Sequence, residues 1–159
     1  LATPVEVQDI LAGELLWCGT KSLINGGAVL AVAAVLGAVH SLAALWVLPV
    51  LFLTGLCFGA MALIMTAYAR GYDFFNYYVT LVLTPMFMLS GVFYPVSSLP
   101  AALQGFVQLL PLTHAVDLIR PLVSGQPLEH VALHLAVLAA YTAAGYLIAA
   151  ILVRRRLLV

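Results

Sequence analysis

Leu45–Ala67 reads LWVLPVLFLTGLCFGAMALIMTA, 23 residues without a charged side chain. A hydrocarbon core of about 30 Å is crossed by roughly 20 apolar residues of helix, so this stretch is long enough to span a membrane. Outward from it, the stretch from Leu23 to Val153 carries formal charge only between its apolar segments, at Arg70, Asp73, Asp117, Arg120 and Glu129. The pattern predicts a chain that folds in lipid.

The composition supports the same conclusion. The chain has 159 residues, 65% hydrophobic and 8% charged, with a mean hydropathy of +1.16. A soluble domain carries about 25% charged residues, so a globular core does not explain these values. The net charge of zero excludes a strongly basic nucleic-acid surface. The first residue is Leu1, and we expect a fragment whose beginning is missing.

Four apolar segments predict an all-α, polytopic membrane helix bundle with four transmembrane helices, at 23–39, 45–67, 77–93 and 131–153. Lys and Arg gather on the cytoplasmic side of membrane proteins. If all four segments cross, Lys21, Arg70 and Arg154–Arg156 share one side, and Arg120 alone is on the other. Both ends are therefore predicted to be cytoplasmic.

The segment 1–21, before the first span, predicts an amphipathic helix on the cytoplasmic membrane surface. Its apolar stripe is expected at Val7, Ile10, Leu11, Leu15 and Trp17. The acids of this segment are Glu6, Asp9 and Glu14, and no basic residue lies between Leu1 and Trp17. Acids anchor a helix poorly at the negative cytoplasmic leaflet. We therefore expect the segment to bind a protein partner, with these acids setting its orientation.

The segment 94–130 is apolar but interrupted by prolines, which stop helices. It predicts a re-entrant outer hairpin of two short helices, Pro100–Leu110 and Thr113–Val123. Asp117 and Arg120 are spaced i,i+3 and are expected to pair. His114 is expected to hydrogen-bond a helix end rather than to catalyse a reaction.

Sites for other chemistry are not evident. The run from Gly13 to Ser22 fails the phosphate-loop pattern, because five residues separate its glycines and Thr20 precedes Lys21. His130 and His134 share a helix face, but two ligands do not make a zinc site. His134 is the only ionisable residue within a predicted span, which argues against proton coupling. We expect no catalytic group and no metal site.

Two patterns leave alternatives open. Gly55 and Gly59 form a small-xxx-small pair, which permits close helix packing either within the chain or in a dimer. Aromatic residues crowd the third predicted span. They form either belts at the two membrane interfaces or a stacking surface for sugar rings and flat apolar groups.

Three stretches carry a resemblance to a known family. They are LATPVEVQDILAGELLW from Leu1, GYDFFNYYVTLVLTPMFMLSGVFYPVSSLP from Gly71, and LLPLTHAVDLIRPLVSG from Leu109. The chain resembles the permease subunit of type-2 ABC exporters, and within that family the NodJ-type branch linked to lipo-oligosaccharide export. The likeness covers essentially the whole chain.

The resemblance implies a six-span permease of the bacterial inner membrane, of which this chain lacks the first two spans. Two permease copies would pair in a homodimer on two separate ABC ATPase subunits, and ATP and Mg would be bound by the ATPases. The chain would move a lipid-linked oligosaccharide and catalyse no reaction itself. A hydrophobic drug exporter permease and a non-transporting membrane scaffold subunit remain the alternatives.

These interpretations assign roles to specific residues. Coupling to the ATPase is predicted for Glu6, Asp9 and Glu14. An outer gate is predicted at Pro111, His114, Asp117 and Arg120. A translocation path is predicted along Phe75, Tyr78, Phe87 and Phe93. The expected partners are the ATPase, a second permease copy and membrane lipid.

Overall fold

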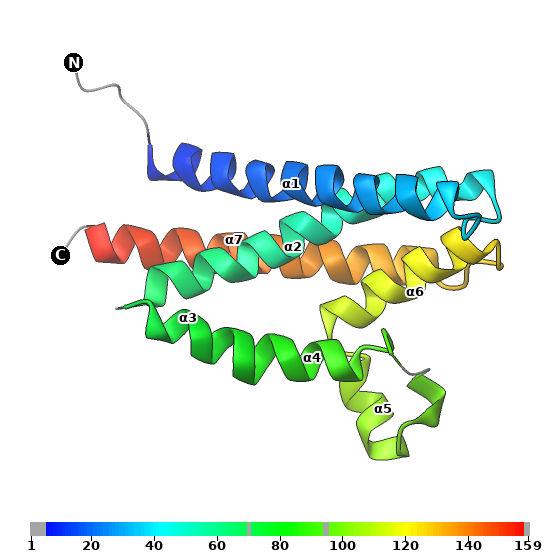
Figure 1. Cartoon of the computed structure of the whole chain (residues 1–159). Coiled ribbons are helices and arrows are strands. Elements are labelled where there is room, and N and C mark those ends of the chain that lie inside the picture. Colours follow the sequence, from blue (N-terminus) through cyan, green and yellow to red (C-terminus); the bar gives the residue numbers. More distant parts are fainter. Residues whose placement is uncertain (1–5, 70, 94–95, 158–159) are drawn as a thin grey trace.

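The computed structural model describes residues 6–69, 71–93 and 96–157, and these ranges contain helices and no strand. Three of the described helices are long and apolar enough to cross a membrane: Val7–Val35, Leu42–Tyr68 and Val131–Arg155. The elements in chain order are α1 (Val7–Val35), η1 (Leu42–Trp46), α2 (Val47–Tyr68), α3 (Asp73–Tyr78), η2 (Val79–Leu83), α4 (Thr84–Leu89), η3 (Val96–Ser98), α5 (Ala101–Val107), α6 (Pro111–Ser124) and α7 (Val131–Leu157). The chain is a membrane helix bundle, as predicted (Figure 1).

Helix α1 runs unbroken for 29 residues, so a separate surface helix does not precede the first predicted span. The placement of 1–21 on the cytoplasmic side stays a prediction. The predicted junction lacks a helix breaker. Instead, the Ser22 hydroxyl donates a hydrogen bond of 2.8 Å to the carbonyl of Leu51 in α2, which holds this part of α1 in the bundle. Of the predicted apolar stripe, Leu11 is buried within the bundle, whereas Ile10 and Trp17 are more than half exposed, and the stripe stays a prediction. Residues 1–5 lie outside the described part.

Helix α2 packs against both α1 and α7 through small residues (Figure 1). A Cβ atom added at Gly55 would lie 3.0 Å from the backbone oxygen of Cys18 and 3.0 Å from the Cα atom of Gly19. A Cβ atom at Gly145 of α7 would lie 2.9 Å from that of Ala60. The predicted small-residue pair therefore serves packing within the chain. Such close approach supplies the dispersion contacts that hold helices together in lipid.

The third predicted span, 77–93, is not one α-helix. The helical run consists of α3, the π-helical η2 and α4, and it ends at Leu89. Pro85 has no amide hydrogen and cannot continue the i→i−4 ladder. The hydroxyl of Thr84 donates to the carbonyl of Val79 at 3.0 Å, five residues back. The number of crossings therefore stays a prediction.

Between the run α3–α4 and α7, the structure has two separate short helices close to the predicted boundaries. The chain is extended at Leu110, with φ −79° and ψ 127°, and Pro111 opens α6. Proline is tolerated there, since the first amide of a helix has no partner within the helix. A left-handed Gly125, with φ 73°, ends α6. Residues 94 and 95 lie outside the described part.

The long helices differ from α6 in how they distribute apolar residues. Helices α1, α2 and α7 are not divided into an apolar and a polar face, whereas α6 has one apolar and one polar face. The buried face of α6 joins a core with α2 and α7, made up of Val47, Val50, Cys57, Ala115, Leu118, Leu122 and Leu138. Helix α6 is therefore placed to contact both of these long helices.

The ends of the elements fall into two groups (Figure 1). The start of α1, the α2–α3 turn and the end of α7 lie at one end of the bundle, and the α1–α2 and α6–α7 loops lie at the other. Arg154 and Arg155 are exposed at the first end. Arg70, which was predicted to share that side, lies outside the described residues. Which end faces the cytoplasm stays a prediction.

Candidate functional site

The turn between α5 and α6 is held by one side chain of α6 and one of α7. Its backbone leaves the carbonyl groups of Gln108 and Leu109 outside regular helix hydrogen bonding. The Nε2 atom of His114 lies 2.8 Å from the oxygen of Gln108, and the Tyr141 hydroxyl donates to the oxygen of Leu109 at 2.7 Å. Gln108 is the C-terminal cap of α5, so the prediction that His114 bonds a helix end is confirmed.

His114 is also paired with His134 of α7, and their Nδ1 atoms are 2.7 Å apart. A carbonyl oxygen can only accept, so Nε2 of a neutral His114 carries the hydrogen and its Nδ1 is an acceptor. Nδ1 of His134 is therefore the donor. Tyr141 lies two helical turns beyond His134, so α7 contacts the α5–α6 turn at two points: through the histidine pair and through a direct bond.

We expect His134→Ala to lower the free energy of unfolding by about 1–3 kcal/mol, because His114, which is 5% exposed, would keep a polar atom without its partner. Chemical unfolding in detergent measures the change. Adding His114→Ala should contribute less than it does alone, since the two rings act as a pair.

His130→Asn is the matched control, one turn earlier on the chain and exposed. Asparagine tolerates the positive φ of 48° at this position, whereas alanine would add backbone strain. Strictly additive effects of the two histidine substitutions would contradict the pairing.

Arg120 ties α6 to the end of α4. Its Nη2 atom donates to the carbonyl oxygen of Gly91 at 2.6 Å, and the oxygen of Val92 is 3.4 Å away. The predicted ion pair with Asp117 is wrong, because no such pair forms between these two described residues. The reason is that Gly91, with φ 82°, turns the chain after α4 and presents carbonyl groups to the guanidinium. Cations are favoured at such a helix C-terminus.

The other predicted gate residues sit on both faces of α6. Pro111 and His114 are buried, whereas Asp117 is exposed and lines a polar cavity with His130 and His134. The structure thus brings His114 and Arg120 into a network that links α4, α5, α6 and α7. His134 and Tyr141 complete this network and were not predicted for it. They lie at least 20 residues from their partners, and no local sequence pattern signals such a contact.

The predicted path residues are not gathered in one cavity. Phe75 and Tyr78 lie on α3 and are partly buried, whereas Phe87 on α4 and Phe93 beyond it are 49% and 64% exposed. A cavity of about 260 Å³ does lie beside α4, but other side chains line it, among them Met86, Phe106 and Tyr141. The translocation path stays a prediction.

The predicted coupling acids lie at the start of α1. The amide of Glu6 donates to a carboxylate oxygen of Asp9 at 3.2 Å, so Asp9 caps the helix. Glu14 is exposed two turns further on. The Tyr146 hydroxyl of α7 donates to the carbonyl of Gln8 at 3.2 Å. This end of α1 is therefore fixed to α7, with its acids at the surface.

Within the described residues, no group of three or more His, Cys, Asp or Glu side chains is placed to hold a metal ion. The candidate site is instead defined by the hydrogen bonds described above. It consists of the α5–α6 hairpin, its bonds to α4 and α7, and the acidic start of α1.

Comparison with known proteins adds the context of these elements. Residues 1–123 match the family model described as ABC-2 type transporter. Nodulation protein J of Rhizobium leguminosarum bv. viciae is 46% identical over 158 residues, which cover 99% of this chain and 61% of that protein. Nodulation protein J of Rhizobium meliloti (strain 1021) is 45% identical over 158 residues, covering 99% and 60%.

A more distant relative is the inner membrane transport permease YadH of Escherichia coli (strain K12). It is 32% identical over 121 residues, which cover 74% of this chain and 46% of that protein. The chain thus spans about three-fifths of the length of the two nodulation proteins. No solved structure gives a significant match.

Proposed function

The chain belongs to the ABC-2 type transporter family, and from that premise we propose that it forms part of the permease of an ATP-driven exporter of amphiphiles. The observation that carries the proposal is the family match together with two nodulation proteins that are at least 45% identical over 99% of the chain. We propose a lipid-linked oligosaccharide as the cargo and the bacterial inner membrane as the location. The relative YadH is an inner membrane transport permease, which supports that membrane.

The energy for transport would come from a separate ABC ATPase subunit, which binds ATP and Mg. The described spans contain little that could couple transport to protons. In the described parts of the three long helices, the carboxylates Asp9 and Glu14 lie in the first turns of α1, and the one imidazole is that of His134. A second permease copy would complete the assembly. This chain would bind and move the cargo and leave bond cleavage to its partner.

The proposed orientation places in the cytoplasm the end of the bundle that holds both the start of α1 and the end of α7. Arg154 and Arg155 support this, since basic residues gather on that side. The hairpin of α5 and α6 would then face outward. Its hydrogen bonds to α4 and α7 would hold the outer side closed until these helices repack.

The start of α1 is the proposed contact with the ATPase. At about 1.5 Å per residue, 29 residues make a helix of roughly 44 Å, which exceeds the hydrocarbon core by about 14 Å. The first turns of α1, with Asp9 and Glu14, would therefore stand in the cytoplasm. A complementary basic surface on the ATPase would receive them.

The proposal is tested by charge reversal at Glu14 in the full-length permease, reconstituted with its ATPase in vesicles. Glu14→Lys is expected to lower transport-linked ATP hydrolysis about fivefold, which corresponds to roughly 1 kcal/mol for an exposed charge pair. ATP hydrolysis and ATP-dependent movement of a fluorescent alkyl glycoside are measured together. Glu14 is preferable to Asp9, because reversal of Asp9 would also remove the cap of α1.

Asp73→Lys is the matched control, because Asp73 is an exposed acid that opens α3, after the α2–α3 turn at the same end of the bundle. It should leave both readouts near their starting values. Normal binding of the ATPase and normal hydrolysis by the Glu14→Lys protein would remove α1 as the contact. The absence of any ATP-dependent movement with the unmutated permease would overturn the proposed function itself.

A further inference from the structure

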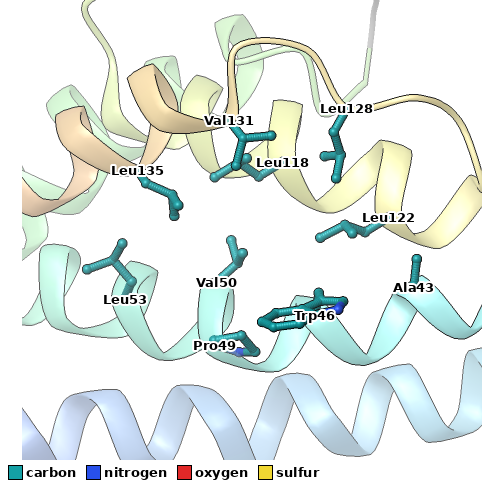
Figure 2. Close-up of a pocket in the computed structure, with 10 residues that line it drawn as sticks. All are labelled: Ala43, Trp46, Pro49, Val50, Leu53, Leu118, Leu122, Leu128, Val131 and Leu135. Carbon is teal, nitrogen blue, oxygen red and sulfur yellow. The ribbon is translucent and has the colours of Figure 1, made fainter.

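An apolar cavity of about 490 Å³ lies between α2, α6 and α7. Figure 2 shows side chains of the first turns of α2, among them Val50 and Leu53, facing Leu122 of α6 and Leu135 of α7 across this space. The volume falls within the roughly 300–1,000 Å³ of small-molecule sites. The lining is apolar except for the indole of Trp46. Such walls suit an alkyl chain.

The cavity lining includes Ala43 of η1 and Leu128 of the α6–α7 loop. The cavity therefore begins at the end of the bundle where Figure 1 shows the α1–α2 and α6–α7 loops. Trp46 lines it there, and Trp side chains favour the membrane–water interface. Leu53 lies seven residues further along the same helical segment, which is about 10 Å deeper at 1.5 Å per residue. A ligand in this cavity would therefore have its tail in the bundle and its head at the interface.

A polar cavity of about 470 Å³ adjoins the same loop. Neighbouring residues along α6 and at the start of α7 line the two cavities in turn. The pairs are Asp117 and Leu118, His130 and Val131, and His134 and Leu135. In each pair, the first residue lines the polar cavity and the second lines the apolar one. The α6–α7 loop repeats this arrangement with Glu129 and Leu128.

The charges of the polar cavity select the head group. Its lining includes two carboxylates, Asp117 and Glu129, and no Lys or Arg. Arg120 lies on the same helix, but its guanidinium is bonded to Gly91. A phosphate head would be repelled by the carboxylates and would find no cation. Hydroxyl groups can donate to carboxylates and accept from imidazoles, so an uncharged glycosyl head fits the lining.

We propose that the two cavities form one binding site for a single-chain amphiphile with an uncharged glycosyl head. The alkyl chain occupies the space between α2, α6 and α7, and the head lies against Asp117, Glu129 and His130. This inference deepens the proposed function and rests on it for the biological role of the ligand. Binding itself does not require the ATPase.

The test uses the full-length permease in membranes and two probes that differ only in the head group. Decyl glucoside and decyl phosphate each carry a diazirine in the alkyl chain, and the labelled peptides are identified by mass spectrometry after illumination. We expect the glucoside to label the segments around Leu53 and Leu122 at least about fivefold more than the phosphate does, as for roughly 1 kcal/mol of charge repulsion.

Further substitutions test the apolar half and the polar half of the site separately. Ala43→Trp fills the mouth of the apolar cavity, and labelling should be lost; Ala139→Trp, at an exposed alanine of α7, should leave it unchanged. Leu128→Trp repeats the filling from the loop if the first variant does not fold. Glu129→Lys should shift the preference toward the phosphate.

Three results would overturn the inference: equal labelling by both probes, labelling spread evenly over exposed apolar faces such as that of Trp17, or unchanged labelling in both cavity-filling variants. The first two would identify the occupant as ordinary bilayer lipid. These results would leave the proposed function standing if ATP-dependent movement persists. Retained, selective labelling without such movement would remove the function and keep the site.

Discussion

Gly55→Leu is expected to abolish most of the folded protein. The Cβ atom of any side chain at this position would lie 2.5 Å from Cβ of Ser22, as well as within 3.0 Å of backbone atoms of Cys18 and Gly19. Backbone cannot yield as a flexible side chain does, so α1 would have to move away from α2. Overpacking typically costs about 1–3 kcal/mol, and we expect a loss at or above the upper value here.

The same displacement would break the hydrogen bond from Ser22 to Leu51 across this interface. The amount of monodisperse protein after stepwise heating, measured by size-exclusion chromatography in detergent, reports the loss. Gly13→Leu is the matched control on α1, because an added Cβ atom there meets nothing within 4 Å. Equal heat resistance of the Gly55→Leu protein and the control would show that α1 and α2 do not pack through these glycines.

Arg120→Ala is expected to release α6 from the end of α4 with little loss of folded protein. Hydrogen bonds to charged groups contribute about 1.5–3 kcal/mol, so the bound arrangement should become at least about tenfold less populated. Spin labels at Phe93 and Ser124, in a background without Cys18 and Cys57, report the separation of the two helices. The distance distribution should broaden, and export should fall in parallel.

The controls for Arg120 distinguish its observed contact from an ion pair. Arg120→Lys should retain part of the narrow distribution, because one ammonium group can still reach a carbonyl oxygen. Asp117→Asn should leave the distribution unchanged, since Arg120 bonds to Gly91 and not to Asp117. A narrow distribution for Arg120→Ala would show that its bond to Gly91 does not hold α6 at the end of α4. A broad distribution for Asp117→Asn would show that the carboxylate is needed to orient the guanidinium.

The membrane bundle could be predicted from the sequence because lipid imposes a simple rule. A span must be apolar, long and helical, and Leu45–Ala67 satisfies that rule without reference to any other part of the chain. The prolines around the α5–α6 hairpin also act locally, because each lacks the amide hydrogen that would continue a helix. Two short helices could therefore be predicted there. The hydrogen bond between His114 and Gln108 is local as well, because it joins residues six positions apart.

The errors arose where a local pattern has two outcomes. The predicted surface segment ends at Lys21, but the long side chain of Lys21 is compatible with a continuous helix and its ammonium lies 5.3 Å from the centre of the Trp17 ring. Asp117 and Arg120 have the spacing of an ion pair. Whether they use it depended on Gly91, 29 residues away, and the sequence carries no signal for that competition.

The unbroken course of α1 has a consequence for how motion would pass through the bundle. Where a loop joins a surface helix to a span, the loop bends, and a displacement of the surface helix is not passed on to the span. A continuous helix moves as one rigid rod. Pivoting about its middle against α2, a rod of roughly 44 Å that tilts by about 10° shifts each end by about 4 Å in opposite directions. A small movement at Glu14 would thereby arrive, reversed in sense, at the loop beside Trp46.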